Sequence, residues 1–141
     1  MNLLSIAAGL IITAILAAAS MTGVEALIHG ARVSALESII RHVQQESIQY
    51  GQMNGGYQNI SCQALVTDNL WLPQGCSNAT QFNTEIPVSM SVSSPSPSSF
   101  IVSVTDPTRY FNAEDFANIC KSFSLSSVCI PAYPTISIKN D

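Results

Sequence analysis

The chain has 141 residues and a net charge of −4, and only 10% of its residues are charged. This length allows one small domain beside an N-terminal segment. The five Lys and Arg residues are too few and too scattered to form a basic surface, so no contact with nucleic acid is expected.

The first segment, Met1 to Val24, contains no Asp, Glu, Lys, Arg or Pro and consists mostly of Leu, Ile and Ala. As a helix rising ~1.5 Å per residue it would be about 36 Å long, which exceeds the ~30 Å hydrocarbon core of a bilayer. Small residues such as Gly9 and Gly23 are frequent in it, and they let neighbouring helices approach closely. We therefore expect a transmembrane segment over residues 1–24 that also packs against other helices, followed by an extracytoplasmic domain over residues 25–141.

A cleavable secretory signal peptide is the alternative interpretation of this segment, because the alanines at 17–19 resemble a cleavage site. Such a peptide begins with basic residues, whereas the first basic residue here is Arg32. Basic residues are also what retains an N-terminus in the cytoplasm. We therefore expect that a basic leader is removed from a precursor and that Met1 is the processed N-terminus of the mature protein.

Beyond residue 24 the sequence becomes amphipathic and contains no proline before Pro73. Apolar residues recur at spacings of three and four, which predicts a helix with one apolar stripe. The members of this predicted stripe are Val24, Leu27, Ile28, Ala31, Ala35, Ile39 and Val43. We expect one long helix from about Leu3 to Tyr50, ending at Gly51 or at the Gly55–Gly56 pair.

Residues 52–84 are predicted to be irregular, with a short helical turn over Val66–Trp71 and a loop rich in Pro, Gly and Asn after it. The turn is expected to direct apolar side chains into the core, and these are Leu65, Leu70, Trp71 and Leu72. His29 and His42 have no second histidine or cysteine at ligand spacing, so we expect ordinary helix residues rather than a metal site.

Alternation of apolar and small residues predicts two strands, Glu85–Ser94 and Phe100–Val104, which would form a β-hairpin. The stretch Ser94–Ser99 between them contains two prolines, which lack the N–H that a strand ladder needs. We expect this stretch to be a long, exposed and flexible tip that tolerates an inserted epitope.

Asn112 is a favourable N-cap for a short helix over Ala113–Ser122, whose first turn carries two acidic residues. A final strand is predicted over Thr135–Lys139. The expected fold is therefore α+β: a long N-terminal α-helix, apolar in its first half, packed on a small antiparallel sheet of three strands with one short helix.

The four cysteines are Cys62, Cys76, Cys120 and Cys129. An even number without a closely spaced pair favours two disulfides over a zinc site and indicates an oxidising compartment. Three pairings are open. We favour Cys62–Cys76 together with Cys120–Cys129, because these bridges close short local loops.

Three features together match one family layout. Met1-Asn2-Leu3-Leu4 opens an apolar helix, an amphipathic continuation runs to about Tyr50, and Cys120 and Cys129 bracket the last helix-to-strand connection. This layout resembles that of type IV pilins, and within them the type IVb class and the major pilins of conjugative thin pili. The segment from Asn112 to Lys121 is also similar to the penultimate helix of those pilins.

The resemblance implies a subunit that polymerises through its N-terminal helix and carries a processed, methylated N-terminus. The filament-core residues that it implies are Met1, Leu3, Leu4, Ser5, Gly9 and Gly23. The family usually has Glu at the fifth position, where it pairs with the N-terminal amine of a neighbouring subunit, whereas Ser5 offers only a hydroxyl. The family's helix-breaking proline near position 22 is absent, so we expect any unwinding in a filament to be short and centred on residues 20–24.

We therefore expect a structural subunit that resides in the inner membrane before assembly and then forms, with other copies of itself and with pilus assembly machinery, an extracellular pilus on the bacterial surface. Conjugation, adhesion, DNA uptake and secretion are all open as its purpose, and so is the choice between a major and a minor pilin. A single-span, membrane-anchored binding module outside the cytoplasm is the alternative. No enzyme and no cofactor are expected, because no GxSxG, HExxH or phosphate-binding loop occurs.

Overall fold

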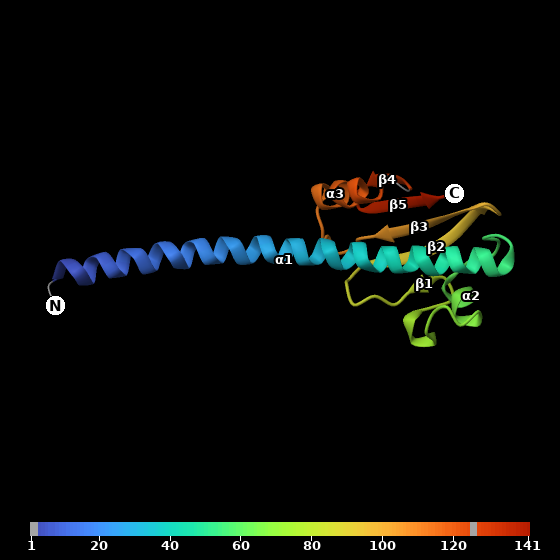
Figure 1. The fold of residues 1–141 in the computed structure, drawn as a ribbon, viewed down its shortest axis with the longest axis horizontal. Helices are drawn as coiled ribbons and strands as arrows, with labels where there is room; N and C mark the ends of the chain where they lie inside the picture. The colour runs from blue at the N-terminus through green and yellow to red at the C-terminus, as the bar shows by residue number, and fades with distance from the viewer. Residues whose placement is uncertain (1–2, 125–126) are drawn as a thin grey trace. The chain divides into compact units, whose positions relative to one another are not determined.

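The structure, a computed structural model, describes the backbone of residues 3–124 and 127–141, and the side chains of residue 28, residues 30–124 and residues 127–141. The chain divides into two compact units, residues 1–35 and residues 36–141. The helix α1 (Leu3–Asn54) begins in the first unit and continues into the second. The second unit also contains α2 (Cys62–Thr67), the 3₁₀ helix η1 (Pro73–Gly75), β1 (Gln81–Phe82), β2 (Ser89–Ser96), β3 (Ser99–Thr105), α3 (Ala113–Phe123), β4 (Val128–Ala132) and β5 (Thr135–Asn140) (Figure 1).

The long helix is continuous from Leu3 to Asn54, and its end confirms the second of the two predicted positions. Gly55 follows it with φ of +71°, a left-handed conformation that glycine adopts without the steric cost of a Cβ atom. The backbone of residues 20–24 is helical here. The expected unwinding concerns the filament and stays a prediction.

The buried stripe of α1 lies on a different set of residues from the predicted one. Ala35 is exposed and Ile39 is only half-buried, whereas the fully buried positions include Leu36 and Ile40. Val43 is common to both stripes. The helix turns its larger side chains inward, because Leu36 and Ile40 remove more apolar surface from water than an alanine would.

The sheet has five antiparallel strands in the order β1-β2-β3-β5-β4, so the α+β class is confirmed but the predicted number of strands is wrong. The strand β1 has two residues, too few for a periodicity to show. The strand β4 contains Pro131, and a proline in a sequence argues against a strand at its position. Proline is tolerated there because β4 is an edge strand and needs ladder hydrogen bonds on one side only.

The inner face of the sheet is apolar and fully shielded from water. Its buried residues from the three central strands are Met90, Val92, Val102, Val104, Ile136 and Ile138. Two helices contribute to the same core. α1 contacts β5 through a 3.4 Å hydrogen bond from Gln44 Nε2 to Asn140 Oδ1, and the guanidinium carbon of Arg41 lies 4.6 Å from the centre of the Phe123 ring of α3.

The predicted short helix is confirmed as α3, and its start is explained by a capping box. The Asn112 side chain accepts a hydrogen bond from Asp115 N at 2.8 Å, and the Asp115 carboxylate accepts one from Asn112 N at 3.1 Å. Phe116, Ile119 and Phe123 are fully buried. Regular spacing and a sharp N-cap therefore make this the element that the sequence predicts best.

The hairpin tip differs from the prediction of a long flexible loop over Ser94–Ser99. β2 continues to Ser96 through a bulge, and only Pro97 and Ser98 form the turn. The carbonyl oxygen of Pro97 accepts a hydrogen bond from Tyr57 N at 2.9 Å, next to Gly56, where a Cβ atom would lie 2.9 Å from that same oxygen. The turn is thus held against the loop after α1, and its tolerance of an inserted epitope stays a prediction.

Candidate interaction surfaces

Both favoured disulfides are present, and they close the loops on which two exposed surfaces are built. Cys62 pairs with Cys76 and Cys120 pairs with Cys129, with Cα atoms 5.9 and 5.3 Å apart. The first bridge joins α2 to the residue after η1, and the second joins α3 to β4. The predicted pairing is therefore confirmed.

The first surface is built around Trp71, in the loop closed by Cys62 and Cys76. The indole Nε1 donates a hydrogen bond to the carbonyl oxygen of Gly75 at 3.1 Å. A Cβ atom on Gly75 would lie 2.2 Å from that nitrogen, so the ring lies directly against the backbone of η1. This close approach explains why a glycine occupies the position, and it fixes the ring relative to the disulfide.

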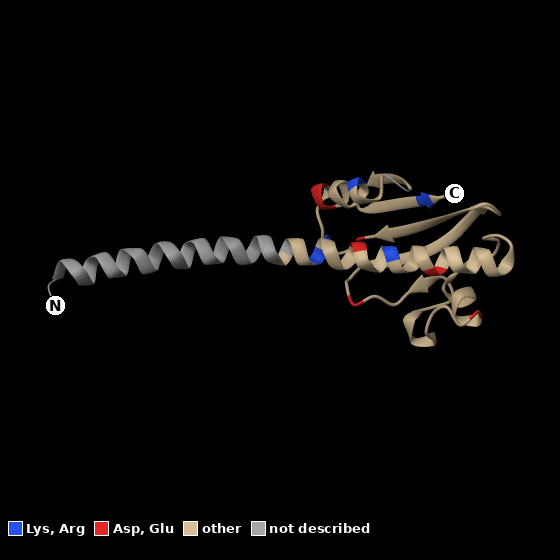
Figure 2. Cartoon of the chain, viewed as in Figure 1, with Lys and Arg blue, Asp and Glu red and all other residues tan. Residues whose placement is uncertain are grey.

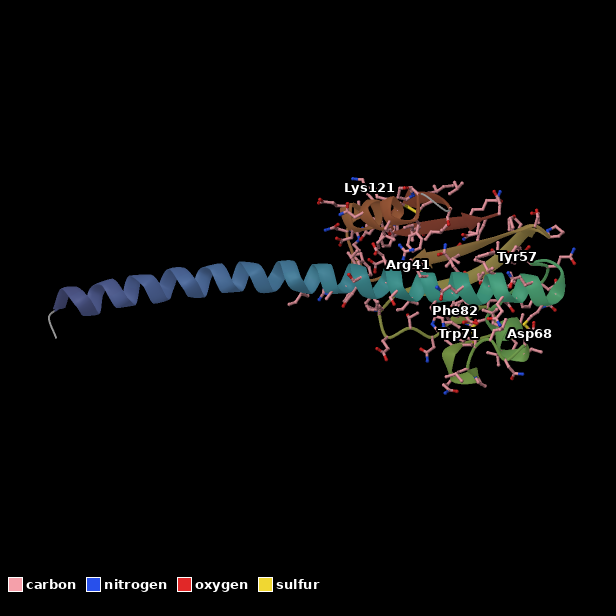
Figure 3. The ribbon with its side chains drawn as sticks, viewed as in Figure 1. Arg41, Tyr57, Asp68, Trp71, Phe82 and Lys121 are labelled. Atoms are coloured by element: carbon pink, nitrogen blue, oxygen red, sulfur yellow. A yellow bond between two sulfur atoms is a disulfide. The ribbon has the colours of Figure 1, made fainter. Side chains whose placement is uncertain are left out.

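The Trp71 ring also packs on α1 and on β1. Its centre lies 4.7 Å from the His42 ring and 5.1 Å from the Phe82 ring. Figure 3 labels Trp71 and Phe82. Beside the Trp71 ring lies a mostly apolar pocket of about 660 Å³, lined by His42, Val66, Asn69, Leu70, Trp71, Leu72, Pro73, Gln74 and Gly75. A smaller hollow that includes Phe82 and Glu85 shares His42 and Trp71 with this pocket. We call the pocket and the hollow together the Trp71 groove.

The residues in and around the Trp71 groove carry negative charge. No Lys or Arg occurs between Arg41 and Arg109 in the sequence. Glu85 lines the smaller hollow, and Glu46 Oε1 lies 3.6 Å from His42 Nε2. In Figure 2, α2 and the loop after β1 carry red positions alone, whereas α1 and α3 carry both red and blue positions. A partner that docks here would meet an apolar surface with an acidic edge.

Tyr50 connects the end of α1 to the same region. Its hydroxyl donates a hydrogen bond to the carbonyl oxygen of Gln58 at 2.9 Å. Burial, and then the nearby Asp68 carboxylate, raise the pKa of the Tyr50 phenol above its ordinary value. Both causes favour the neutral phenol, which is the form that donates this hydrogen bond.

The second surface is the edge strand β4. Val128 and Ile130 are 57% and 59% exposed, and Ala132 continues the same side of the strand. Directly opposite residues of an antiparallel pair share a face, so Lys139, which pairs with Val128, adds a cation beside them. We call Val128, Ile130 and Ala132 the β4 patch.

The β4 patch is suited to side-chain contact rather than to strand addition. Pro131 lacks the N–H that an added strand would use, a common protection of exposed edges. The neighbouring outer face of the sheet carries Lys139 and is otherwise rich in hydroxyls, which come from Ser89, Ser91, Ser93, Ser103, Thr105, Thr135 and Ser137. The hydroxyls of Thr105 and Thr135 are 3.3 Å apart across two strands. An exposed apolar cluster at the rim of such a face marks a candidate contact.

Some of the residues that were predicted to enter the core are buried, and others are exposed. Trp71 is half-buried, but Leu72 is 65% exposed, so the expectation that it enters the core is wrong. Leu65 is fully buried, as predicted, in the helix α2, whose N-cap Ser61 accepts a hydrogen bond from Ala64 N. The sequence reasoning missed Val128 and Ile130 as a surface. Their alternation with Cys129 and Pro131 was the signal that could have revealed a strand.

The predicted filament-core residues lie outside the described side chains. They are Met1, Leu3, Leu4, Ser5, Gly9 and Gly23. The predicted membrane segment, residues 1–24, lies outside them as well. Within the part of the chain that the structure describes, no helix combines the length and the hydropathy needed to cross a membrane. In that same part, no group of His, Cys, Asp and Glu side chains is arranged to hold a metal ion.

Comparisons with protein-family models, with curated proteins and with solved structures found no match for this chain.

Proposed function

We propose that the chain is a structural subunit of a type IV pilus-like filament. The observation that carries the proposal is that residues 36–141 expose two unlike apolar surfaces, the Trp71 groove and the β4 patch. A surface that binds its own copy gives a closed dimer, whereas two different surfaces that bind each other give a chain of subunits. If their rotation does not close a ring, that chain grows into an open helical filament.

The charges around the two surfaces support a contact between them. The Trp71 groove has Glu46 and Glu85 nearby and no Lys or Arg in its lining. The β4 patch lies beside Lys139, although Asp141 Oδ1, 3.3 Å from the Lys139 Nζ atom, offsets part of that charge. Such rim charges contribute more to orientation than to affinity. The main attraction would come from Leu72, Val128 and Ile130, which leave water together.

The N-terminal segment completes the proposal. Residues 1–24 are free of charge and long enough to reside in the inner membrane before assembly. Moving an apolar helix from lipid into a core of similar helices changes little in hydrophobic free energy, so close packing of small residues would decide the transfer. The filament would then be an extracellular pilus, a homopolymer raised by assembly machinery, with conjugation or adhesion as its purpose and no contact with nucleic acid required.

A membrane-anchored binding module, or a minor pilin in that role, is the second candidate. The observation that favours it is the pocket of about 660 Å³ beside Trp71, which is within the usual size of ligand sites. In that case the groove would hold a different protein or ligand, and the chain would remain a monomer.

A cysteine-pair experiment separates these two functions. Leu72→Cys and Ile130→Cys are introduced together in the full chain, and sheared cell-surface material is oxidised and run on non-reducing gels. We expect a ladder of covalent multimers from the double variant, because each groove meets the patch of the next copy. Each single variant should give no species larger than a dimer.

The matched control is Met53→Cys combined with Ile130→Cys, since Met53 is 57% exposed but lies in neither surface. It should not form a ladder. A double variant without multimers, or an equal ladder from the control, would contradict the proposed contact.

A further inference from the structure

Two stretches of the chain match the acceptor pattern for N-linked glycosylation, which is Asn-x-Ser or Asn-x-Thr. They are Asn59-Ile60-Ser61 and Asn78-Ala79-Thr80. The two disulfides are typical of an oxidising compartment, which is where such sugars are attached. A match is used only where a transferase reaches the asparagine and the two residues after it, so the surroundings of each stretch decide between them.

The first stretch is built into the fold. Asn59 itself is exposed, but Ile60 is only 5% exposed and lies in the core. The Ser61 hydroxyl is the N-cap of α2 and accepts a hydrogen bond from Ala64 N at 3.1 Å. The residue that follows is a fully buried disulfide cysteine. A transferase that binds residues 59–61 would have to draw Ile60 out of the core and release the cap, so this stretch is a poor acceptor.

The second stretch lies on an exposed turn. Residues 77–80, which join the first disulfide to β1, are all exposed. The Asn78 Oδ1 atom accepts hydrogen bonds from Thr80 N and Thr80 Oγ1, both at 3.0 Å, and from Gln81 N at 2.9 Å. A backbone hydrogen bond of 3.1 Å ties the turn to α2. Binding of this turn in an extended form would break surface hydrogen bonds but would uncover no apolar core.

The hydrogen bonds of this turn also fix the orientation of the Asn78 amide. Backbone N–H groups only donate, so the amide atom that faces Thr80 N and Gln81 N must be the oxygen. The Nδ2 atom makes a contact of 3.4 Å with Gln81 Oε1, which is longer than an ordinary hydrogen bond. The amide nitrogen is thus presented at the surface, and the Thr80 hydroxyl that the pattern requires lies against the same amide.

We propose that Asn78 is N-glycosylated and that Asn59 is not. The sugar donor is an oligosaccharide linked through a diphosphate to a membrane lipid. The Asn78 Nδ2 atom forms a bond to C1 of the first sugar while the bond from C1 to the diphosphate oxygen breaks. The lipid diphosphate leaves with that electron pair, and the nitrogen loses one proton to a base of the transferase, so no oxidant or reductant is needed.

The modification goes beyond the filament function. Asn78 lines neither hollow of the Trp71 groove and lies outside the β4 patch. A monomeric chain would carry the glycan equally, so its presence or absence leaves the filament contact to be decided by the cysteine-pair experiment.

Glycopeptide mass spectrometry tests the proposal on the full chain, isolated from the membranes or filaments of the cells that make it. Cleavage after acidic residues separates the two candidates, because Asp68 lies between Asn59 and Asn78. Fragmentation that keeps sugars attached then assigns a glycan to one residue without assuming its composition. We expect a glycan on the peptide that contains Asn78 and an unmodified peptide around Asn59.

Three variants test whether the acceptor pattern itself is recognised. Thr80→Ala should abolish the modification, since it removes the required hydroxyl and leaves Asn78 in place. Thr80→Ser should retain it, which separates loss of the pattern from a general disturbance of the turn. Ser61→Ala is the matched control, because it destroys the other match and should leave the glycan on Asn78. The proposal is overturned if Asn78 is unmodified in the unchanged chain, if a glycan is found on Asn59, or if Thr80→Ala is still glycosylated.

Discussion

The two disulfides close loops of similar length in regions that are built in different ways. Cys62 and Cys76 are separated by 14 positions, and Cys120 and Cys129 by 9. In the first region, α2 buries only Cys62 and Leu65, and η1 buries nothing. In the second, α3 places Phe116, Ile119 and Phe123 in the core and is capped at its start. The first region is held by its covalent bridge and by Trp71, whereas the second is held by packing and needs its bridge less.

This difference bears on the two exposed surfaces. The Trp71 groove depends on an irregular loop whose shape is fixed by few contacts, so small changes there should alter the groove before they alter the fold. The β4 patch belongs to a strand that pairs with β5 over its whole length. We therefore expect the groove to be the adjustable side of a contact between copies and the β4 patch to be its rigid side.

The largest expected effect comes from the packed region. Ile119→Ala should lower the free energy of unfolding by about 2–5 kcal/mol, because Ile119 is fully buried and its loss leaves a cavity. Ile130→Ala is the matched control, with the same change at a 59% exposed position, and should stay within about 0.5 kcal/mol. Urea unfolding of both variants measures the difference. Similar losses in the two variants would show that the core does not extend to α3 as described.

The next effect separates the two bridges. Loops of this length predict a loss of about 3 kcal/mol when either disulfide is removed by a double Cys→Ser change. The native states should differ, however. Removing Cys62–Cys76 should shift the fluorescence emission of Trp71, whereas removing Cys120–Cys129 should leave it unchanged, because α3 stays packed. A shift of equal size in both variants would remove the distinction between the regions.

The same contrast explains what the sequence reveals and what it does not. The short helix is predicted correctly, since Asn112 and the spacing of its buried residues are local signals. The disulfide pairing favoured from the short loops is confirmed, although the sequence left three pairings open. The exposed position of Leu72 could not be predicted from the sequence, because the burial of a loop residue depends on contacts made across the fold. β4 was missed because Pro131 is a strand breaker in the interior of a sheet and harmless at its edge.

The buried stripe of α1 shows a second limit of prediction from the sequence. Ala35 and Ile39 fit a helical periodicity as well as Leu36 and Ile40 do, and only the sheet beneath decides between them. The candidate surfaces were hidden for the same reason. The groove brings together His42, Trp71 and Phe82 from three separate stretches of the chain, and no spacing in the sequence predicts this contact.

A smaller effect compares the two helix caps. Asn112→Ala should cost about 1 kcal/mol because it removes one half of a capping box and leaves the other without its partner. Ser61→Ala should cost less, since Ser61 supplies a single bond to a helix of six residues. Thermal unfolding measures both, with Asn118→Ala, at an exposed site inside α3, as the control. A greater loss from Ser61→Ala would mean that the first region relies on its helix after all.

The smallest effect is the pH dependence from Tyr50. Its pKa is raised in the folded state, so the contribution is complete below the ordinary tyrosine value of about 10 and is lost as pH rises through the folded value. Tyr50→Phe removes this term, and its unfolding free energy should fall less between about pH 9 and about pH 11 than that of the unchanged chain. Equal slopes in the two proteins would show that Tyr50 does not titrate with folding.

The central claim is that copies of this chain join head to tail, the groove of one against the β4 patch of the next. Electron cryo-microscopy of sheared surface fractions from cells expressing the full chain tests it directly. The account predicts filaments with the N-terminal helices in the core and with Leu72 of one subunit close to Ile130 of its neighbour. A chain that stays monomeric, or filaments in which both residues face solvent, would contradict it.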